Sequence, residues 1–420
     1  MTKLISKKQE IKNRIDLINK GEVPEGYKKR FGYIVPNDWD IVPIKKVVTQ
    51  VRRSVDKPNE PYYRLSVRSH AKGTFHSFVE NPEQVAMEEL FEVKENDLIV
   101  NITFAWEHAI AIVKKEDEGL LVSHRFPTYE FNKNACVKFY ENIIKFPRIK
   151  KMLGDMSPGG AGRNRVLNQT DFYNKLYVPY ASRKEQEKIA EILSCCDKLI
   201  ELKSELIQKK KKINISTINK VFNNIFYKKN LVKLSNLCSD FIVPMRDKPK
   251  TFDGSIPWCR IEDVEGNFLN GTKSNKYVSE DTVKKMNLKI IPSGSVICAC
   301  SASIGTYVIN TTPLITNQTF IGLVCSEKIY NKYLLYFLKT QTNNLMRKSN
   351  GTTIGYISRE QFERMDIPYV PMQEQMHIAN VFFQADKEIE LLEQELEQYK
   401  QLKKSLSQLL LTGIVRVNEV

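Results

Sequence analysis

The residues whose types and spacing best suit chemistry lie in a glycine-rich basic loop, residues 157–165, which reads SPGGAGRNR. Glycine lets a backbone approach a phosphate closely. Arginine can form paired hydrogen bonds to guanine, and asparagine can do the same to adenine. The chemistry that this loop predicts is recognition of nucleic acid. Its candidate contact residues are Ser157, Gly160, Arg163, Asn164 and Arg165.

A second loop with similar donors and acceptors lies at the matching place in the second half of the chain. Its candidate contact residues are Asn350, Gly351, Thr352 and Thr353, and Gly351 lies 189 positions after Gly162. A single loop of this kind is more often a plain connecting turn. Two such loops at matched positions in a basic protein favour nucleic-acid binding instead.

Further candidate DNA contacts are polar, basic or aromatic residues elsewhere in the two halves. They are Lys72, Trp106, His108, Arg125, Arg246, Arg260, Ser301, Ser303, Asn317 and Gln318. The net charge of +15 and the pI of about 9.2 suit a polyanionic partner, because neutralising phosphates releases counterions. Charge alone is a weak indication, since it also serves solubility.

The sequence contains no motif of a common catalytic centre. A P-loop, a zincin helix and a nucleophile elbow are all missing. The glycine-rich loop does not follow a hydrophobic strand, which argues against a dinucleotide site. The histidines are scattered, and each alone is more often a surface or core residue than a catalyst. The eight cysteines include no Cys-x-x-Cys pair, so we expect free thiols and no metal site.

The elements that must position these loops are organised by a long internal repeat. Residues 179–190 read PYASRKEQEKIA, and residues 368–379 read PYVPMQEQMHIA. An Asp-Lys pair follows each copy, at residues 197–198 and 386–387, and the two copies align without a gap at a shift of 189. Each half is therefore predicted to be a globular region that ends in a long helix.

Both repeat helices carry apolar residues at coiled-coil spacing, which predicts that each packs along a partner helix. The partner-binding seam positions are Ile189, Leu193, Ile200, Ile378, Phe382, Ile389, Leu392 and Leu396. Lys203 and Lys210 fall on the first seam and predict that it shifts or weakens there, whereas only Lys403 interrupts the second. The nearest partner for either helix is the other repeat helix.

The repeat also predicts the division of the chain. We expect an N-terminal helical segment over residues 1–30, a globular domain over 31–180, a central helix over 181–229, a second globular domain over 230–369 and a C-terminal helix over 370–420. Strands over 97–102 and 109–113 and a helix over 139–153 place the domains in the α/β (α+β) class, and residues 292–300 and 330–345 parallel them. The absence of a long apolar run or a signal peptide predicts a cytoplasmic location without a membrane segment.

On this duplicated motif and its helices, the chain resembles the specificity subunits of Type I restriction–modification systems. Four further segments add to the resemblance, which covers essentially the whole chain: VPEGYK at 23–28, PNDW at 36–39, PWCRI at 257–261 and GSVI at 294–297. The resemblance implies two target-recognition domains, joined by two long antiparallel coiled-coil helices with internal pseudo-two-fold symmetry. Each domain would read one half of a bipartite double-stranded DNA target.

The same resemblance implies partners for the chain. Two methylation subunits, which bind S-adenosylmethionine, and two restriction subunits, which use ATP and magnesium, would assemble on it. The chain itself would carry no cofactor, no metal and no active site, and it would act as specificity subunit and scaffold.

Two other functions stay open at this point. One is a single-chain DNA methyltransferase or nuclease, although a methyltransferase acting on exocyclic amines needs an Asn/Asp-Pro-Pro-aromatic motif that the sequence lacks. The other is a coiled-coil interaction scaffold without DNA binding, against which the basic loops and the net charge argue.

Overall fold

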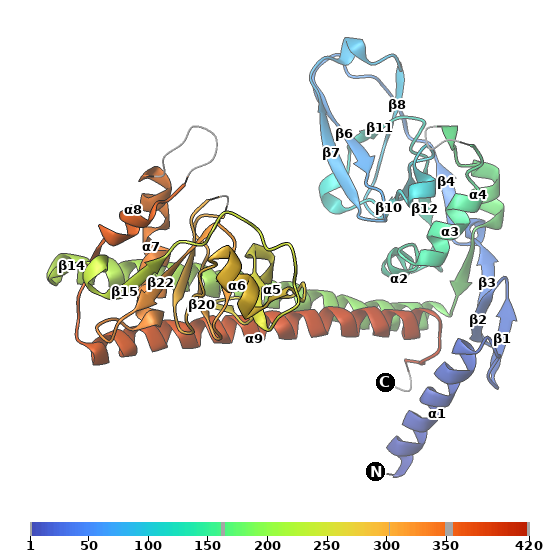
Figure 1. Cartoon of the computed structure of the whole chain (residues 1–420). Coiled ribbons are helices and arrows are strands. Elements are labelled where there is room, and N and C mark those ends of the chain that lie inside the picture. Colours follow the sequence, from blue (N-terminus) through green and yellow to red (C-terminus); the bar gives the residue numbers. More distant parts are fainter. Residues whose placement is uncertain (1, 161–163, 302, 349–355, 418–420) are drawn as a thin grey trace. The chain divides into compact units, whose positions relative to one another are not determined.

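The computed structural model describes residues 2–160, 164–301, 303–348 and 356–417. The chain divides into two compact units, which we call unit 1 (Met1–Leu202 with Glu397–Val420) and unit 2 (Lys203–Leu396). Two long helices, α5 (Arg183–Lys228) and α9 (Met372–Leu411), contribute residues to both units (Figure 1).

Unit 1 combines short helices with several small sheets. Its other helices are α1 (Thr2–Asn19), α2 (Val137–Ile143), α3 (Pro147–Asp155) and α4 (Gln169–Lys175), with 3-10 turns η1 (Ile44–Lys46), η2 (Pro82–Gln84), η3 (Ala105–Glu107) and η4 (Lys115–Asp117). Its strands are β1 (Tyr27–Arg30), β2 (Tyr33–Pro36), β3 (Asp40–Pro43), β4 (Val48–Val51), β5 (Ser54–Asp56), β6 (Tyr62–Val67), β7 (Thr74–Val79), β8 (Glu89–Glu92), β9 (Leu98–Val100), β10 (Ile110–Ile112), β11 (Leu121–Val122), β12 (Thr128–Phe131) and β13 (Tyr177–Tyr180). The two larger sheets have the strand orders β10-β9-β12-β4 and β5-β8-β11-β6-β7.

The single helix that the sequence predicts over residues 139–153 is in fact two helices, α2 and α3. The break falls at Phe146, whose backbone is extended, and Pro147 is the first residue of α3. Proline cannot occupy a helix interior and disfavours helical backbone in the residue before it, but it is well accepted at the first position of a helix.

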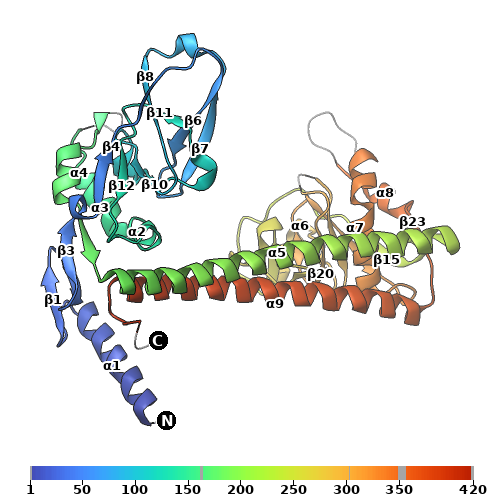
Figure 2. The ribbon, with the colours of Figure 1, turned by 180° about the vertical axis from the view of Figure 1, so that it is seen from behind.

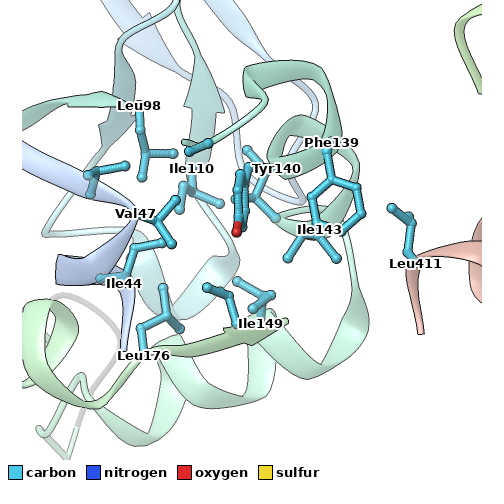
Figure 3. Close-up of a cluster of buried hydrophobic side chains, with 14 of the residues drawn as sticks. Ile44, Val47, Leu98, Ile110, Phe139, Tyr140, Ile143, Ile149, Leu176 and Leu411 are labelled. Atoms are coloured by element: carbon cyan, nitrogen blue, oxygen red, sulfur yellow. The ribbon is translucent and has the colours of Figure 1, made fainter. Parts of the chain in front are cut away.

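The core of unit 1 lies between the β9-containing sheet and helices α2 and α3. In Figure 3, Tyr140 and Ile143 of α2 and Ile149 of α3 lie among Leu98 and Ile110 of the sheet, and all five are essentially inaccessible to solvent. Apolar residues at the C-terminal end of α9 join the same cluster. The C-terminal end of α9 therefore contributes to the core of the first domain.

Unit 2 is built on the same plan. Its other helices are α6 (Glu280–Met286), α7 (Asn331–Lys348) and α8 (Arg359–Glu363), with 3-10 turns η6 (Leu234–Asn236) and η7 (Ile261–Asp263). Its strands are β14 (Leu231–Lys233), β15 (Cys238–Ile242), β16 (Ile256–Cys259), β17 (Phe268–Leu269), β18 (Tyr277–Val278), β19 (Val296–Ala299), β20 (Tyr307–Asn310), β21 (Ile315–Thr316), β22 (Phe320–Cys325) and β23 (Asp366–Pro368). Along the described chain, no helix has the length and apolar character needed to span a membrane.

The predicted repeat is confirmed at the level of strand order. The antiparallel sheet β10-β9-β12-β4 of unit 1 recurs in unit 2 as β20-β19-β22-β15, to which β17 is added. The strand that leads into each long helix also pairs antiparallel with the strand that opens its domain, β13 with β3 and β23 with β14. The fold is thus a duplicated α+β domain with one long helix after each copy.

The glutamine of the repeated motif is buried in both units and makes the same hydrogen bonds. The side-chain oxygen of Gln186 accepts from the backbone N–H of Cys136 (2.8 Å), just before α2. The side-chain oxygen of Gln375 accepts from the backbone N–H of Tyr330 (2.8 Å), just before α7. Each amide nitrogen also donates to a backbone carbonyl five residues earlier, at 2.8 and 2.9 Å. The motif therefore ties the start of each long helix to a helix of the preceding domain.

Helices α5 and α9 lie side by side and antiparallel within each unit (Figure 2). The prediction that the α5 seam weakens at Lys203 and Lys210 is wrong. Their ammonium groups pair with Glu395 (2.9 Å) and Glu388 (2.8 Å) of α9, and Ile207 between them is buried. The lysines can occupy the seam because carboxylates of the facing helix pair with them.

The predicted seam residues are not equally buried. Ile189, Leu193, Phe382 and Ile389 are buried, whereas Ile200, Ile378, Leu392 and Leu396 are half-buried. The largest of them in unit 2 is Phe382, whose ring centroid lies 5.5 Å from that of Tyr336 and 6.4 Å from that of Phe222. Phe382 therefore joins the helix pair to the domain core.

Replacing Phe382 tests this packing. We expect Phe382→Ala to lower the free energy of unfolding by about 3–5 kcal/mol, because it opens a cavity among aromatic rings. Leu391→Ala is the matched control on the same helix, since Leu391 is 56% exposed, and it should change stability by less than about 0.5 kcal/mol. Urea unfolding followed by circular dichroism measures both, and equal losses would contradict the packing role of Phe382.

Candidate nucleic-acid interface

In unit 1, three loops that are distant in sequence meet at Ile102, just after β9. The backbone N–H of Ile102 donates to the carbonyl of Arg125 (3.0 Å), and the Ile102 carbonyl accepts from the N–H of Leu167 (2.8 Å). Ile102 leads directly into η3, which carries Trp106, and Leu167 closes the glycine-rich loop. Main-chain hydrogen bonds thus bring together the loops that carry most of the unit 1 candidates.

The turn between β6 and β7 is a fourth segment at the same place (Figure 1). The N–H groups of His70 and Ala71 donate to the carbonyls of Glu107 (2.9 Å) and His108 (2.8 Å). His70, Ala71 and His108 all have positive φ, at 62°, 51° and 70°. Such conformations are costly for these residue types and are maintained only by surrounding contacts, and they cluster at functional sites. Lys72 is exposed on this turn.

The β6–β7 hairpin is anchored through Asp117, which is 1% exposed. The Asp117 carboxylate accepts from Thr74 Oγ1 (2.7 Å), His76 Nε2 (2.7 Å) and the backbone N–H of Lys114 (3.0 Å). Burial acts to raise the pKa of Asp117, but these hydrogen bonds outweigh it and lower the pKa. A buried anion therefore connects β7 to η4 and positions the hairpin.

The side chain of Arg165 organises the glycine-rich loop instead of pointing into solvent. Its Nε donates to the carbonyl of Ser157 (3.0 Å), one terminal nitrogen donates to that of Gly154 (2.8 Å), and the guanidinium lies 5.3 Å from the ring centroid of Trp106. A Cβ at Gly159 would lie 2.6 Å from the carbonyl oxygen of residue 164, so the chain can turn back only over a glycine. Two of its donors satisfy carbonyls at the end of α3, and base reading by Arg165 stays a prediction.

Two further predicted DNA contacts are buried. His108 is 4% exposed and its Nε2 lies 2.6 Å from the carbonyl oxygen of Ile144, and burial lowers the pKa of the imidazole. Ser157 is inaccessible, and its hydroxyl donates to the carbonyl of Leu153 (2.7 Å). Both side chains satisfy interior backbone groups, and contact of either with DNA stays a prediction.

Other unit 1 candidates do face solvent. Lys72, Arg125, Gly160 and Asn164 are exposed and Trp106 is half-buried, while Arg163 lies outside the described residues. Phe104 is a further exposed residue that is not among the candidates predicted from the sequence: it is 45% exposed although its backbone N–H and carbonyl are both hydrogen-bonded within the η3 loop. The sequence did offer an indication that Phe104 could contact a ligand, because it is an aromatic residue two positions before Trp106 in a segment between two strands.

In unit 2, Cys300 occupies the place of Ile102. Its backbone N–H donates to the carbonyl of Thr319 (2.8 Å), and its carbonyl accepts from the N–H of Ile357 (2.8 Å). Ile357 and Leu167 each close the loop that precedes a short helix, α8 in unit 2 and α4 in unit 1. The same two backbone hydrogen bonds therefore join the equivalent loops of the second domain.

Several unit 2 candidates lie on the loops that meet at Cys300. Gln318 is exposed, and Ser301, Ser303 and Asn317 are half-buried. Asn317 accepts from the hydroxyl of Thr319 (2.7 Å). Asn350, Gly351, Thr352 and Thr353 lie outside the described residues.

The two predicted arginines of unit 2 lie beside these loops. Arg260 follows β16, whose parallel partner β21 leads into Asn317, and it forms an ion pair with Glu262 (2.9 Å). Arg246 is exposed. Burial raises the pKa of Tyr356, and the positive charge of Arg246 opposes this rise.

The possible metal ligands in the part of the chain that the structure describes are dispersed. No group of three or more His, Cys, Asp or Glu side chains there could hold an ion. All eight cysteines are free, and five of them are buried.

Duplicated domains that present exposed basic, amide and aromatic side chains on converging loops define a protein of the nucleic-acid recognition class. The family described as "Type I restriction modification DNA specificity domain" matches residues 36–213 and 232–401. These two matches span most of the chain, so the chain belongs to this family. Members of the family recognise DNA as the non-catalytic specificity component of Type I restriction–modification complexes.

Individual relatives agree with this assignment. The chain is 25% identical over 430 residues to the Type I restriction enzyme MjaVIII specificity subunit of Methanocaldococcus jannaschii. The alignment covers 94% of this chain and 97% of the relative. Its fold is similar to that of the HsdS subunit from Thermoanaerobacter tengcongensis (TM-score 0.54, 17% identity, 92% and 100% coverage). It is also similar to a chain from a structural study of complex assembly and conformational transition of the type I R-M system (TM-score 0.64, 16% identity). The match covers 91% of this chain and 99% of that chain.

The role of Arg165 can be tested by stability. Arg165→Ala leaves two carbonyls at the end of α3 without their donor, so we expect a loss of about 1–3 kcal/mol in the free energy of unfolding. Arg125→Ala is the matched control, because the Arg125 side chain is exposed, and it should cost less than about 0.5 kcal/mol. If Arg165→Ala left urea unfolding unchanged but relaxed DNA specificity at one base pair, Arg165 would be a reader after all.

Proposed function

We propose that this chain reads a bipartite double-stranded DNA target, with the loops around Ile102 reading one half and the loops around Cys300 reading the other. The observation that carries the proposal is the pair of backbone hydrogen bonds that Ile102 and Cys300 have in common. Each unit joins three equivalent loops by the same backbone hydrogen bonds, but the loops carry different side chains in the two units. This arrangement suits two domains that each read a different part of one DNA target.

The exposed side chains suggest how each half is read. Arg125 can donate paired hydrogen bonds to guanine, and Asn164 can pair with adenine in the major groove. Gln318 offers the same amide chemistry in unit 2. Lys72 suits a phosphate, since phosphate contacts position a protein without carrying sequence information. Because these side chains differ between the units, the two half-sites should differ in sequence.

The helix pair is the proposed attachment surface for the partner subunits. A groove of about 270 Å³ between α5 and α9 in unit 2 is lined by apolar side chains, among them Val381 (55% exposed) and Ile213 (65% exposed), and by polar side chains at Lys210, Asn214, Thr217 and Glu388. Exposed apolar residues on paired helices suit an apolar helix face of a partner. The internal duplication supports two methylation subunits and two restriction subunits per chain. These partners would supply S-adenosylmethionine, ATP and magnesium, and the complex would act in the cytoplasm.

Selection of bound duplexes from a random pool tests the two-reader proposal. Arg125→Ala should lose preference at one base pair of one half-site, because a good bidentate base contact contributes about 1–3 kcal/mol of discrimination. Gln318→Ala should relax the other half-site. Arg364→Ala is a control, since Arg364 is exposed, pairs with Glu360 and lies outside the converging loops.

Three outcomes of the selection are distinct. Loss of preference in separate half-sites supports the proposal. If either variant lost base preference equally in both half-sites, this result would contradict independent reading. If Arg125→Ala weakened all sequences evenly and lowered the salt slope by about one, Arg125 would contact phosphate instead of a base.

A further inference from the structure

Unit 2 contains a basic loop, residues 244–250, which follows β15 and reads PMRDKPK. Both prolines of this loop are buried, whereas its charged residues face solvent: Arg246, Asp247, Lys248 and Lys250. Buried prolines hold the loop ends against the domain and restrict the backbone between them. Within the described residues, none of the three cations forms an ion pair.

A fourth cation meets this loop at an aromatic pair, in which Trp258 is buried and Phe252 is half-buried. The ammonium groups of Lys248 and Lys276 each lie 5.7 Å from the ring centroid of Trp258, and that of Lys276 lies 5.6 Å from the centroid of Phe252. Trp258 is 4% exposed, and its centroid lies 5.6 Å from that of Phe252. The aromatic faces therefore hold two like charges in one small region, without a carboxylate partner in the described structure. A bound anion would relieve their repulsion.

This cationic cluster lies next to the loops that meet at Cys300. Ile242 at the end of β15 lies opposite Gly322 of β22, and Ala299 at the end of β19 lies opposite Phe320 of the same strand. The basic loop after β15 and Cys300 after β19 therefore leave the sheet at the same end. The cluster is thus adjacent to the residue around which unit 2 gathers its reading loops.

We propose that Arg246, Lys248, Lys250 and Lys276 form a phosphate clamp, which holds the phosphodiester backbone of the DNA beside the half-site that unit 2 reads. The proposal rests on the proposed function and adds the ligand group and the residues that bind it. Duplex DNA carries one negative charge per about 1.7 Å of its axis, so several phosphates lie within reach of clustered cations. Contacts of this kind contribute affinity and register, and they leave the choice of sequence to the reading loops.

The salt dependence of binding tests the clamp in the full chain. A variant with Arg246→Gln, Lys248→Gln, Lys250→Gln and Lys276→Gln should lower the magnitude of the slope of log K against log salt by about 0.9 per lost contact, or about 3–4 in all. The duplex sequence selected from a random pool should stay the same. The charge-matched control changes four exposed lysines of unit 1 that form no ion pair in the described structure, and it should leave the slope nearly unchanged: Lys8, Lys12, Lys20 and Lys29.

Neutral backbone linkages locate the contacts on the DNA. Methylphosphonates placed beside one half-site should weaken binding of the wild type, and they should weaken the clamp variant no further, because both remove the same contacts. The same linkages beside the other half-site should weaken both proteins equally. Melting temperatures of the variants within a few degrees of the wild type confirm that the fold is intact.

The possible failures are distinguishable. If the wild-type chain shows no preference for any duplex, the proposed function is wrong and the clamp fails with it. If the wild type selects a bipartite target but the clamp variant keeps the wild-type slope, the clamp alone is wrong. Equal loss of slope in the clamp variant and in the control would show a general charge effect and would also overturn the clamp.

Discussion

A buried amide that must be satisfied is the constraint on which the rest of the structure depends. Gln186 and Gln375 lie in the interior at the start of the two long helices, and each is satisfied by two backbone segments, one just before a helix of the domain and one just before its own long helix. Leaving such a group unpaired costs about 1–3 kcal/mol. The same motif therefore positions each domain in the same way on its own helix, and in each domain equivalent loops meet, at Ile102 in unit 1 and at Cys300 in unit 2.

The same logic explains the polar residues of the helix pair. Asp197 pairs with Lys403 in unit 1, and at the repeat-equivalent positions in unit 2 Asp386 accepts from Asn214 (2.6 Å). Polar groups on a seam cost stability unless partners satisfy them, but they define the register of the helices. The two halves thus share a polar contact between α5 and α9 at equivalent positions, which is an ion pair in unit 1 and an amide–carboxylate hydrogen bond in unit 2.

The organisation of the chain was predictable from the sequence, but the directions of individual side chains were not. The repeat and the seams are periodic patterns, and periodicity reports which face of a helix is buried. Ser157, His108 and Arg165 lie in loops, where tertiary contacts decide which way a side chain points, and all three turn toward backbone carbonyls. The Lys203 and Lys210 positions resembled breaks in a seam because their partners, Glu395 and Glu388, are almost 200 residues away in sequence.

Site-specific photocrosslinking tests most directly whether two loop clusters read two halves of one target. A benzophenone amino acid would replace Phe104 in one chain and Gln318 in another, and each would be irradiated on the selected duplex. We expect the two crosslinks to map to different half-sites, that from position 104 to one half and that from position 318 to the other. Crosslinks from both positions to the same half-site, or only to the DNA between the halves, would contradict it.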